Sequence, residues 1–248
     1  MRRKKCFFFS IIIALCTFCC CDRYYIPKMP EGQLRMPKNK VWAHKVNDLS
    51  VLKTKQRRFC GIELDLVYSF YQNKLFVCHD EEDTTKNLTL EKWFEAINHP
   101  QKHCYWIDVK NLNYFTADSI SCMVKRILEQ YNIVDQAFLE SSNENGIIKA
   151  RMHNLHTSLW VDNINWSHVD TATWINKTSR QIEEMHPDCI SCEYRMFEAL
   201  TKYFPDENIL LWHTPAELTP ENADLTCKFC KNPSVKIVLV DYDKPIKY

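Results

Sequence analysis

The stretches GIELDLV (61–67) and CYWIDVK (104–110) decide the fold of this chain. Each is a short apolar run, typical of a buried β-strand, that carries charged side chains toward its end. Successive side chains of a strand point to opposite faces, so Glu63 and Asp65 share one face, and Asp108 and Lys110 do the same. Such strands indicate a parallel sheet with polar groups at its carboxyl-terminal edge.

The same pattern recurs from residue 41 to residue 242, with helical patterns between the runs. Leu90, Trp93, Phe94 and Ile97 fall at i, i+3, i+4 and i+7, which predicts one apolar helix face. A second such face is formed by Ile120, Val124, Ile127, Leu128 and Tyr131. The other predicted strands are VWAHKV (41–46), AFLESS (137–142), TSLWVDN (157–163), CISCEY (189–194), NILLWHT (208–214) and KIVLVDY (236–242), with KLFVCH (74–79) in a hairpin. Alternating strands and helices of this number predict an α/β chain with one (β/α)₈ TIM barrel over residues 41–248.

Composition narrows the function classes. The chain has 248 residues, enough for one barrel, but only 3 glycines, so the glycine-rich phosphate loops of the common nucleotide-binding folds are absent. Four of the 32 basic residues lie in the first five positions, and without them 28 basic residues face 31 acidic ones. A mildly acidic body does not suggest nucleic acid as a partner.

Residues 1–21 have the composition of an export signal. A basic head (2–5) precedes an apolar run (7–15) that is too short for a comfortable membrane span, and Cys19, Cys20 and Cys21 follow. The cysteines resemble the end of a bacterial lipoprotein signal, in which one cysteine is lipidated. We therefore expect an exported protein, bound to a bacterial membrane through a lipid anchor and the proline-containing tether 22–40. Plain secretion and an uncleaved apolar anchor are the alternatives.

Two of the later cysteine pairs have the C-x-x-C spacing of zinc sites. Cys189 and Cys192 fall in a predicted strand, where a spacing of three places side chains on opposite faces. Cys227 and Cys230, predicted between a helix and a strand, would also suit a disulfide in an exported protein. Simple burial is the favoured state of most of these thiols.

Polar residues gather late in the predicted strands, at the rim where barrel active sites lie. They are His44, Glu63, Asp65, Asp108, Lys110, Glu140, Asp162, Glu193, His213 and Asp241. Trp160, Trp212 and Tyr242 are predicted near the same rim, either lining a pocket or packed in the core.

Three carboxylates on this rim, those of Glu63, Asp65 and Asp108, would repel one another unless a cation lies between them. Hard oxygen ligands favour one Mg²⁺ or Ca²⁺ over zinc. A salt-bridge network of these acids with Lys110 is the alternative without a metal.

His44 ends the first predicted strand and His79 ends the hairpin strand, so both share the rim with the carboxylates. Two imidazoles beside a metal suit general acid–base catalysis, with one removing a proton and the other supplying one. Structural histidines are the alternative.

The successive motifs of the chain resemble those of the glycerophosphodiester phosphodiesterase family. They are His44–Lys45, GIELDL (61–66), CHDEEDTT (78–85), WIDVK (106–110), ILLWHT (209–214) and IVLVDYDKP (237–245). That PLC-like barrel superfamily also contains phosphatidylinositol-specific phospholipase C and spider sphingomyelinase D. The closest resemblance is to its menorin-type branch, through WAHKVND (42–48), GIELDL, LTLEKWFEAI (88–97) and WIDVKN (106–111). The resemblance is specific over residues 42–113 and loose over 114–248.

The resemblance implies that His44 and His79 are the acid–base pair and that Lys110 contacts phosphate. It also implies that Glu63, Asp65 and Asp108 hold the divalent metal. Lys45, Glu140 and Trp212 are the further candidates for substrate contacts.

The chain departs from the family pattern at three places. Lys45 replaces a usual arginine, and Asp108 replaces a usual glutamate, although menorin-type proteins share the aspartate. Only 24 residues separate Asp83 from Asp108, so the insertion that builds a glycerol-binding cap is missing.

These observations predict a metal-dependent phosphodiesterase that acts on a small-molecule or lipid phosphodiester, such as a glycerophosphodiester or a lipid head group. The main alternative is a non-enzymatic ligand-binding barrel of the menorin type. A glycoside hydrolase that uses Glu140 with Glu193 is a third interpretation.

Overall fold

The computed structural model describes residues 30–164 and 168–248. Their nine strands form one sheet, and all strands but β3 pair in parallel and close into a barrel, since β1 pairs with both β9 and β2. The barrel strands are β1 (Val41–Ala43), β2 (Gly61–Ser69), β4 (Cys104–Val109), β5 (Ala137–Ser141), β6 (His156–Trp160), β7 (Cys189–Glu193), β8 (Ile209–Trp212) and β9 (Val235–Val240). The hairpin strand β3 (Lys74–Val77) lies antiparallel to β2. The predicted (β/α)₈ TIM barrel and its hairpin are confirmed.

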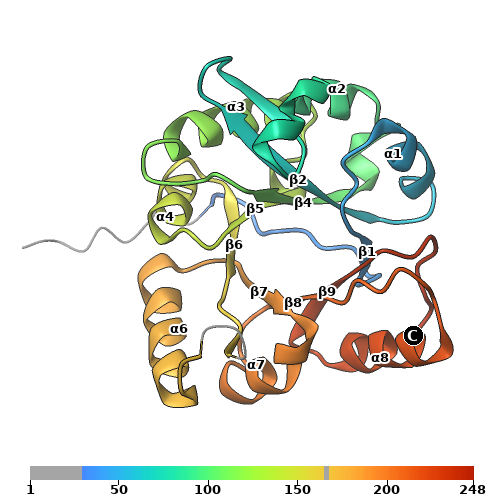
Figure 1. Cartoon of the computed structure of the whole chain (residues 1–248), viewed down its shortest axis with the longest axis vertical. Coiled ribbons are helices and arrows are strands. Elements are labelled where there is room, and N and C mark those ends of the chain that lie inside the picture. Colours follow the sequence, from blue (N-terminus) through green and yellow to red (C-terminus); the bar gives the residue numbers. More distant parts are fainter. Residues whose placement is uncertain (1–29, 165–167) are drawn as a thin grey trace, which may run out of the picture.

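Helices lie outside the strands (Figure 1). They are α1 (Leu49–Lys55), α2 (Leu90–Glu95), α3 (Ala117–Gln130), α4 (Glu144–Met152), α6 (Thr171–Met185), α7 (Phe197–Tyr203) and α8 (Pro220–Lys231). Short 3₁₀ turns are η1 (Glu81–Lys86), η2 (Pro100–Lys102), η3 (Val134–Gln136) and η4 (Tyr194–Met196). Five helices are preceded by a residue whose side chain accepts a hydrogen bond from a backbone N–H of the first turn. This N–H would otherwise have no partner within the helix. These caps are Asp48, Thr89, Asn143, Asp170 and Thr219.

The core has two layers, as the period-two alternation of the strands requires. The inward layer contains Trp42, Trp106 and Phe138, while Ile62 and Leu64 belong to the larger layer between the strands and the helices. The predicted apolar faces of α2 and α3 are buried in that outer layer. Inward-facing polar residues are therefore exceptions inside the barrel.

Residues 30–40 have no helix or strand but pack against the amino-terminal end of the barrel. Leu34 and Met36 contact the inward layer, and the Arg35 N–H donates to the Asp135 carbonyl over 2.7 Å. The Lys40 ammonium donates to two carbonyls beside the end of α8. The described part of the predicted tether is thus held on the barrel. Cys19, Cys20 and Cys21 lie outside the described residues.

In the part of the chain that the structure describes, none of the helices has the length and apolar character to cross a membrane.

All eight cysteines among the described residues are free thiols. Cys189 lies in the inward layer and Cys192 in the outer one, on opposite faces of β7 as predicted. Cys227 and Cys230 lie within α8, so their predicted place between a helix and a strand is wrong; the helix capped by Thr219 continues through both residues. Neither pair forms a disulfide or a candidate zinc site.

Candidate active site

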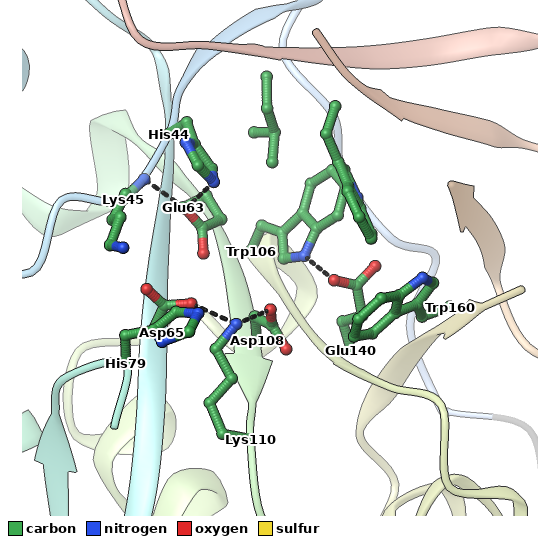
Figure 2. A pocket seen from close by; sticks show the side chains of 12 residues that line it. His44, Lys45, Glu63, Asp65, His79, Trp106, Asp108, Lys110, Glu140 and Trp160 are labelled. Carbon is green, nitrogen blue, oxygen red and sulfur yellow. Dashed lines mark hydrogen bonds and ion pairs between the residues drawn. The ribbon is translucent and has the colours of Figure 1, made fainter. Parts of the chain in front are cut away.

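A pocket of about 210 Å³ opens at the carboxyl-terminal ends of the barrel strands. All nine described residues that the sequence predicts for catalysis, metal binding or substrate contact line it; they are His44, Lys45, Glu63, Asp65, His79, Asp108, Lys110, Glu140 and Trp212. Trp106, Trp160 and Leu239 complete the lining. Figure 2 shows the two histidines, the two lysines and the carboxylates of Glu63, Asp65 and Asp108 on one side of Trp106, and Glu140 and Trp160 on the other.

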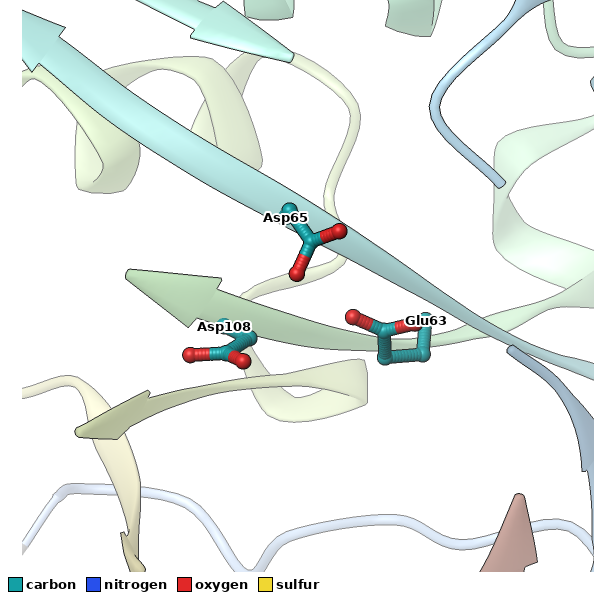
Figure 3. Close-up of side chains that lie close together, drawn as sticks. All are labelled: Glu63, Asp65 and Asp108. Carbon is teal, nitrogen blue, oxygen red and sulfur yellow. The ribbon is translucent and has the colours of Figure 1, made fainter. Parts of the chain in front are cut away.

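The acidic part of the pocket is built by two neighbouring strands. Glu63 and Asp65 project from β2 and Asp108 from β4, where Asp65 and Asp108 are register partners (Figure 3). One ligand oxygen from each residue lies within 4.8 Å of the others. Glu63 and Asp65 are buried. The period-two spacing therefore places three carboxylates together, as predicted.

The chemistry of these donors fits a divalent cation. Burial raises the pKa of Glu63 to about 8, and the negative charge of Asp65 adds to the rise. Burial also raises the pKa of Asp108. Three carboxylates this close together repel one another, and a cation that their oxygens can share would relieve the repulsion. The triad is a candidate site for Mg²⁺ or Ca²⁺.

Lys110 lies between two of these acids (Figure 2). Its ammonium nitrogen is 2.6 Å from Asp65 Oδ1 and 2.5 Å from Asp108 Oδ2. Burial lowers the pKa of Lys110, but the charges of Asp108 and Asp65 outweigh it and the net shift is upward. The salt-bridge network considered from the sequence thus exists for Asp65 and Asp108, and it keeps a positive charge at the pocket.

The loop between β1 and α1 holds the β2 carboxylates in place. The Lys45 N–H donates to Glu63 Oε2 over 2.5 Å, from a backbone with φ of 52°. This left-handed conformation is uncommon for a residue with a side chain. Asn47 pairs twice with Asp65, by donating from Nδ2 to Oδ2 over 2.5 Å and by accepting the Asp65 N–H over 2.9 Å. Sequence reasoning missed Asn47, because nothing local indicates that it faces β2.

Both histidines are held through Nδ1 by an aspartate. His44 Nδ1 lies 2.7 Å from Asp241 Oδ1, and its Nε2 lies 3.9 Å from Glu63 Oε2. Burial lowers the pKa of His44, but the hydrogen bond to Asp241 and the charge of Glu63 raise it more, so the net shift is upward. His79 Nδ1 lies 2.8 Å from Asp80 Oδ1. Fixing one nitrogen sets the tautomer and orientation with which the other meets a ligand.

The other side of the pocket is aromatic around one buried acid. Trp106 donates from Nε1 to Glu140 Oε2 over 3.0 Å, and the Ser191 hydroxyl donates to Oε1. Burial raises the pKa of Glu140 well above its usual value. The rings of Trp160 and Trp212 meet edge to face, with centroids 4.9 Å apart and planes at 73°.

Trp106 was not singled out from the sequence, although a signal existed. It precedes Asp108 by two residues on one strand, so it faces the same way.

Some predicted rim residues do not line the pocket. The Asp162 carboxylate pairs with Lys177 instead, 2.5 Å away. His213 is buried, and its ring packs against Tyr194 and Phe229. Tyr242 is buried with its hydroxyl near Thr226. Strand-end position alone does not decide the direction in which a side chain points.

Glu193 also turns away from the pocket. It accepts the Arg195 N–H at the start of η4 and a hydrogen bond from Asn163. Glu140 and Glu193 are therefore not brought together in the pocket, and the geometry does not support the glycoside hydrolase interpretation.

No protein-family model and no curated protein matches this sequence. Solved structures do match the fold. A phosphodiesterase from Oleispira antarctica, in complex with its product sn-glycerol-3-phosphate, has a TM-score of 0.61 at 14% identity, covering 84% of this chain and 94% of its own. A glycerophosphodiester phosphodiesterase from Parabacteroides distasonis has a TM-score of 0.61 at 12% identity, covering 84% and 95%.

A structure from outside this group shows how widely the barrel is shared. A 2,3-dimethylmalate lyase has a TM-score of 0.50 at 13% identity, covering 84% of this chain and 77% of its own. The resemblance to the menorin-type branch stays a prediction from the sequence. The chain has the (β/α)₈ barrel fold that these glycerophosphodiester phosphodiesterase structures share.

Proposed function

We propose that this protein is a phosphodiesterase that hydrolyses a small-molecule or lipid phosphodiester with one bound divalent cation. The observation that carries the proposal is the convergence of three carboxylates, two aspartate-held histidines and one lysine in a single pocket. Active sites of TIM barrels lie at this end of the strands. The likeness to phosphodiesterase structures supports the same chemistry.

The residues divide into binding and proton-transfer groups. Glu63, Asp65 and Asp108 would hold the cation, which when bound would neutralise phosphate charge and position the attacking oxygen. The ammonium groups of Lys110 and Lys45 would contact phosphate oxygens.

Hydrolysis breaks one phosphorus–oxygen bond and forms another, so one proton leaves the attacking oxygen and one reaches the leaving oxygen. His44 and His79 would supply these two functions, because both line the pocket and an aspartate holds Nδ1 of each, which leaves Nε2 for proton transfer. The attacking oxygen is either that of water or a neighbouring hydroxyl of the substrate, which would give a cyclic product.

We further propose that the protein is exported and held on a bacterial membrane by a lipid on Cys19, Cys20 or Cys21. The basic head and the apolar run before these cysteines support it. A fatty-acid label should be incorporated by the parent and lost when the three cysteines are replaced together. A label that persists in the triple variant would exclude this attachment.

The enzyme proposal is tested by screening the full chain against phosphodiesters with Mg²⁺, Ca²⁺ or EDTA. We expect hydrolysis that depends on the cation and is lost in His44→Ala while the variant stays folded by circular dichroism. A folded parent that binds a phosphodiester but never hydrolyses one would instead support the binding-barrel interpretation.

A further inference from the structure

A second pocket lies at the other end of the barrel from the candidate active site. It has a volume of about 460 Å³ and opens where β2 and β4 begin. One wall is the connection from α1 to β2 (56–60). The other wall is formed by four residues between α2 and β4, which are Asn98, His99, Lys102 and His103. The proposed hydrolysis uses none of these residues.

The charge of this second pocket is positive. Arg57, Arg58 and Lys102 line it, and none of the described residues around it carries a carboxylate. Within the described part of the chain, Arg57 and Lys102 form no ion pair, unlike Lys149, whose ammonium lies 2.6 Å from a carboxylate oxygen. Arg58 donates from Nη1 only to the Asp243 carbonyl, over 3.1 Å. Three positive charges in one hollow repel one another, and a bound anion would relieve the repulsion.

Hydrogen bonds fix the two walls relative to each other. The Asn98 N–H donates to Gln56 Oε1 over 2.8 Å, and His103 Nδ1 donates to the Phe59 carbonyl over 3.1 Å. A ligand would therefore meet a formed pocket, and little free energy would be spent on ordering loops.

One wall also offers a buried imidazole. His103 is 7% exposed and lines the pocket. Its Nδ1 is held by the Phe59 carbonyl, while its Nε2 has no hydrogen-bond partner among the described residues. Burial lowers the pKa of His103, which favours the neutral ring. A bound anion would favour the protonated ring, in which Nε2 becomes a donor.

The three cations match the chemistry of a phosphomonoester. Such a group carries a charge of about −1.5 to −2 at pH 7 and three strong acceptor oxygens. Guanidinium and ammonium groups donate charge-assisted hydrogen bonds to phosphate oxygens. A phosphodiester has only one negative charge, so it would satisfy fewer of these cations.

We propose that this pocket is a second ligand site, which binds a phosphomonoester group through Arg57, Arg58 and Lys102. The volume leaves room for an organic group esterified to the phosphate. The site lies apart from the proposed hydrolysis and does not depend on it.

The thiol of Cys60 is a local reporter of binding, because it lines the pocket and is exposed. Its rate of alkylation by iodoacetamide, a neutral reagent, can be followed in the full chain by peptide mass spectrometry. Phenyl phosphate should slow the alkylation of Cys60 but not that of Cys122, an exposed thiol outside the pocket. Equal rates for Cys60 with and without phenyl phosphate would overturn the inference.

Phenyl sulfate tests the charge requirement, because it has the shape of phenyl phosphate but only one negative charge. We expect half-maximal protection of Cys60 to need about twofold to fivefold more phenyl sulfate, the range of one solvent-screened ion pair. Equal protection by the two esters would contradict recognition of a phosphomonoester.

Variants locate the site. Arg57→Gln and Lys102→Gln should each raise the half-protective concentration of phenyl phosphate by about twofold to fivefold. Lys53→Gln is the matched control, since it removes the same charge from an exposed position of α1 outside the pocket, and it should behave as the parent does. An equal effect of all three substitutions would show that only the general surface charge matters, and would overturn the assignment.

Vesicles separate a soluble ligand from a lipid head group. Phosphatidylcholine vesicles that contain phosphatidic acid present a phosphomonoester, whereas those that contain phosphatidylglycerol present only phosphodiesters. Stronger binding of the full chain to the phosphatidic acid vesicles, lost in the double variant Arg57→Gln/Lys102→Gln, would assign the site to a lipid head group. Protection by phenyl phosphate without that vesicle preference would assign it to a soluble phosphomonoester. Neither experiment measures hydrolysis, so failure of the enzyme proposal would leave this site standing.

Discussion

A Cβ atom on Gly61 would lie only 1.9 Å from the indole of Trp42. Trp42 is 1% exposed and belongs to the inward layer of the barrel, near Phe138. Gly61 begins β2, next to the point where β1 and β2 pair and close the barrel. The missing side chain at this position leaves room for a large ring under the pocket.

Gly61→Ala should therefore destabilise the protein. The added carbon overlaps a buried ring, so we expect the free energy of unfolding to fall by about 1–3 kcal/mol. Urea denaturation measures this change. Gly146→Ala is the comparison and should cost less: its Cβ would lie 2.7 Å from the Leu112 side chain rather than 1.9 Å from a ring, and alanine favours the surrounding helix α4. An equal loss in the two variants would contradict the role of the Trp42 contact.

Cation binding is predicted to stabilise the fold through Asp65. A ligand that binds only the native state raises its stability by mass action, so Mg²⁺ or Ca²⁺ should raise Tm and EDTA should reverse the gain. Asp65→Asn removes a charged ligand from the triad and should lose most of the response. Asp83→Asn, which changes an acid outside the pocket, should respond as the parent does. If Mg²⁺ or Ca²⁺ raises the Tm of Asp65→Asn as much as that of the parent, the cation does not bind through Asp65.

Acid stability should depend on Asp188, far from the pocket. Its carboxylate accepts hydrogen bonds from the fully buried Arg151, from His156 and from the Thr157 N–H. Burial raises the pKa of Asp188, but the hydrogen bond to His156 and the nearby positive charges lower it more, so the net shift is downward. The native state then binds fewer protons than the unfolded chain. The stabilisation is present above pH of about 4 and is lost as pH falls through the native pKa.

Asp188→Asn tests this dependence. At pH 7 the free energy of unfolding of the variant should be about 3 kcal/mol lower than that of the parent, because the charge that faces a buried guanidinium is removed. Between pH 7 and pH 3, the Tm of the variant should fall less than that of the parent. Asp224→Asn, at an exposed carboxylate of α8, should match the parent at every pH. Parallel Tm–pH curves for Asp188→Asn and the parent would rule out the role of this ion pair.

Sequence reasoning recovered the parts that follow from local periodicity. The barrel was predictable because each strand is a short apolar run between helical patterns. The acidic triad was predictable because Glu63 and Asp65 differ by two positions on one strand and Asp108 lies on its neighbour. Both conclusions need only strand geometry and the order of elements.

Contacts through space were not predictable. Asn47 meets Asp65 because the β1–α1 loop folds back over β2, and Asp241 meets His44 because β9 closes the barrel beside β1. Glu193, although similarly placed at a strand end, was drawn to the first turn of η4 instead. A residue's position along a strand restricts its direction, whereas its partner is set by the tertiary structure.

The last prediction concerns His44 and His79. If they transfer the two protons of hydrolysis, His44→Ala and His79→Ala should each lower kcat by roughly 10²–10⁴-fold at saturating cation. The double variant should lose less than the product of the two factors, since groups that act in one step are not independent. The pH–rate profile of the parent should be bell-shaped.

Asp241 should tune one limb of that profile. Its hydrogen bond helps to raise the pKa of His44, so Asp241→Asn should move the limb that belongs to His44 toward lower pH while the other limb stays in place. Asp243→Asn, two residues away and 73% exposed, is the matched control and should leave both limbs unchanged. A profile that is the same in Asp241→Asn and in the parent would show that His44 does not titrate in the reaction. His44 would then be better described as a residue that positions Glu63, from which its Nε2 lies 3.9 Å away.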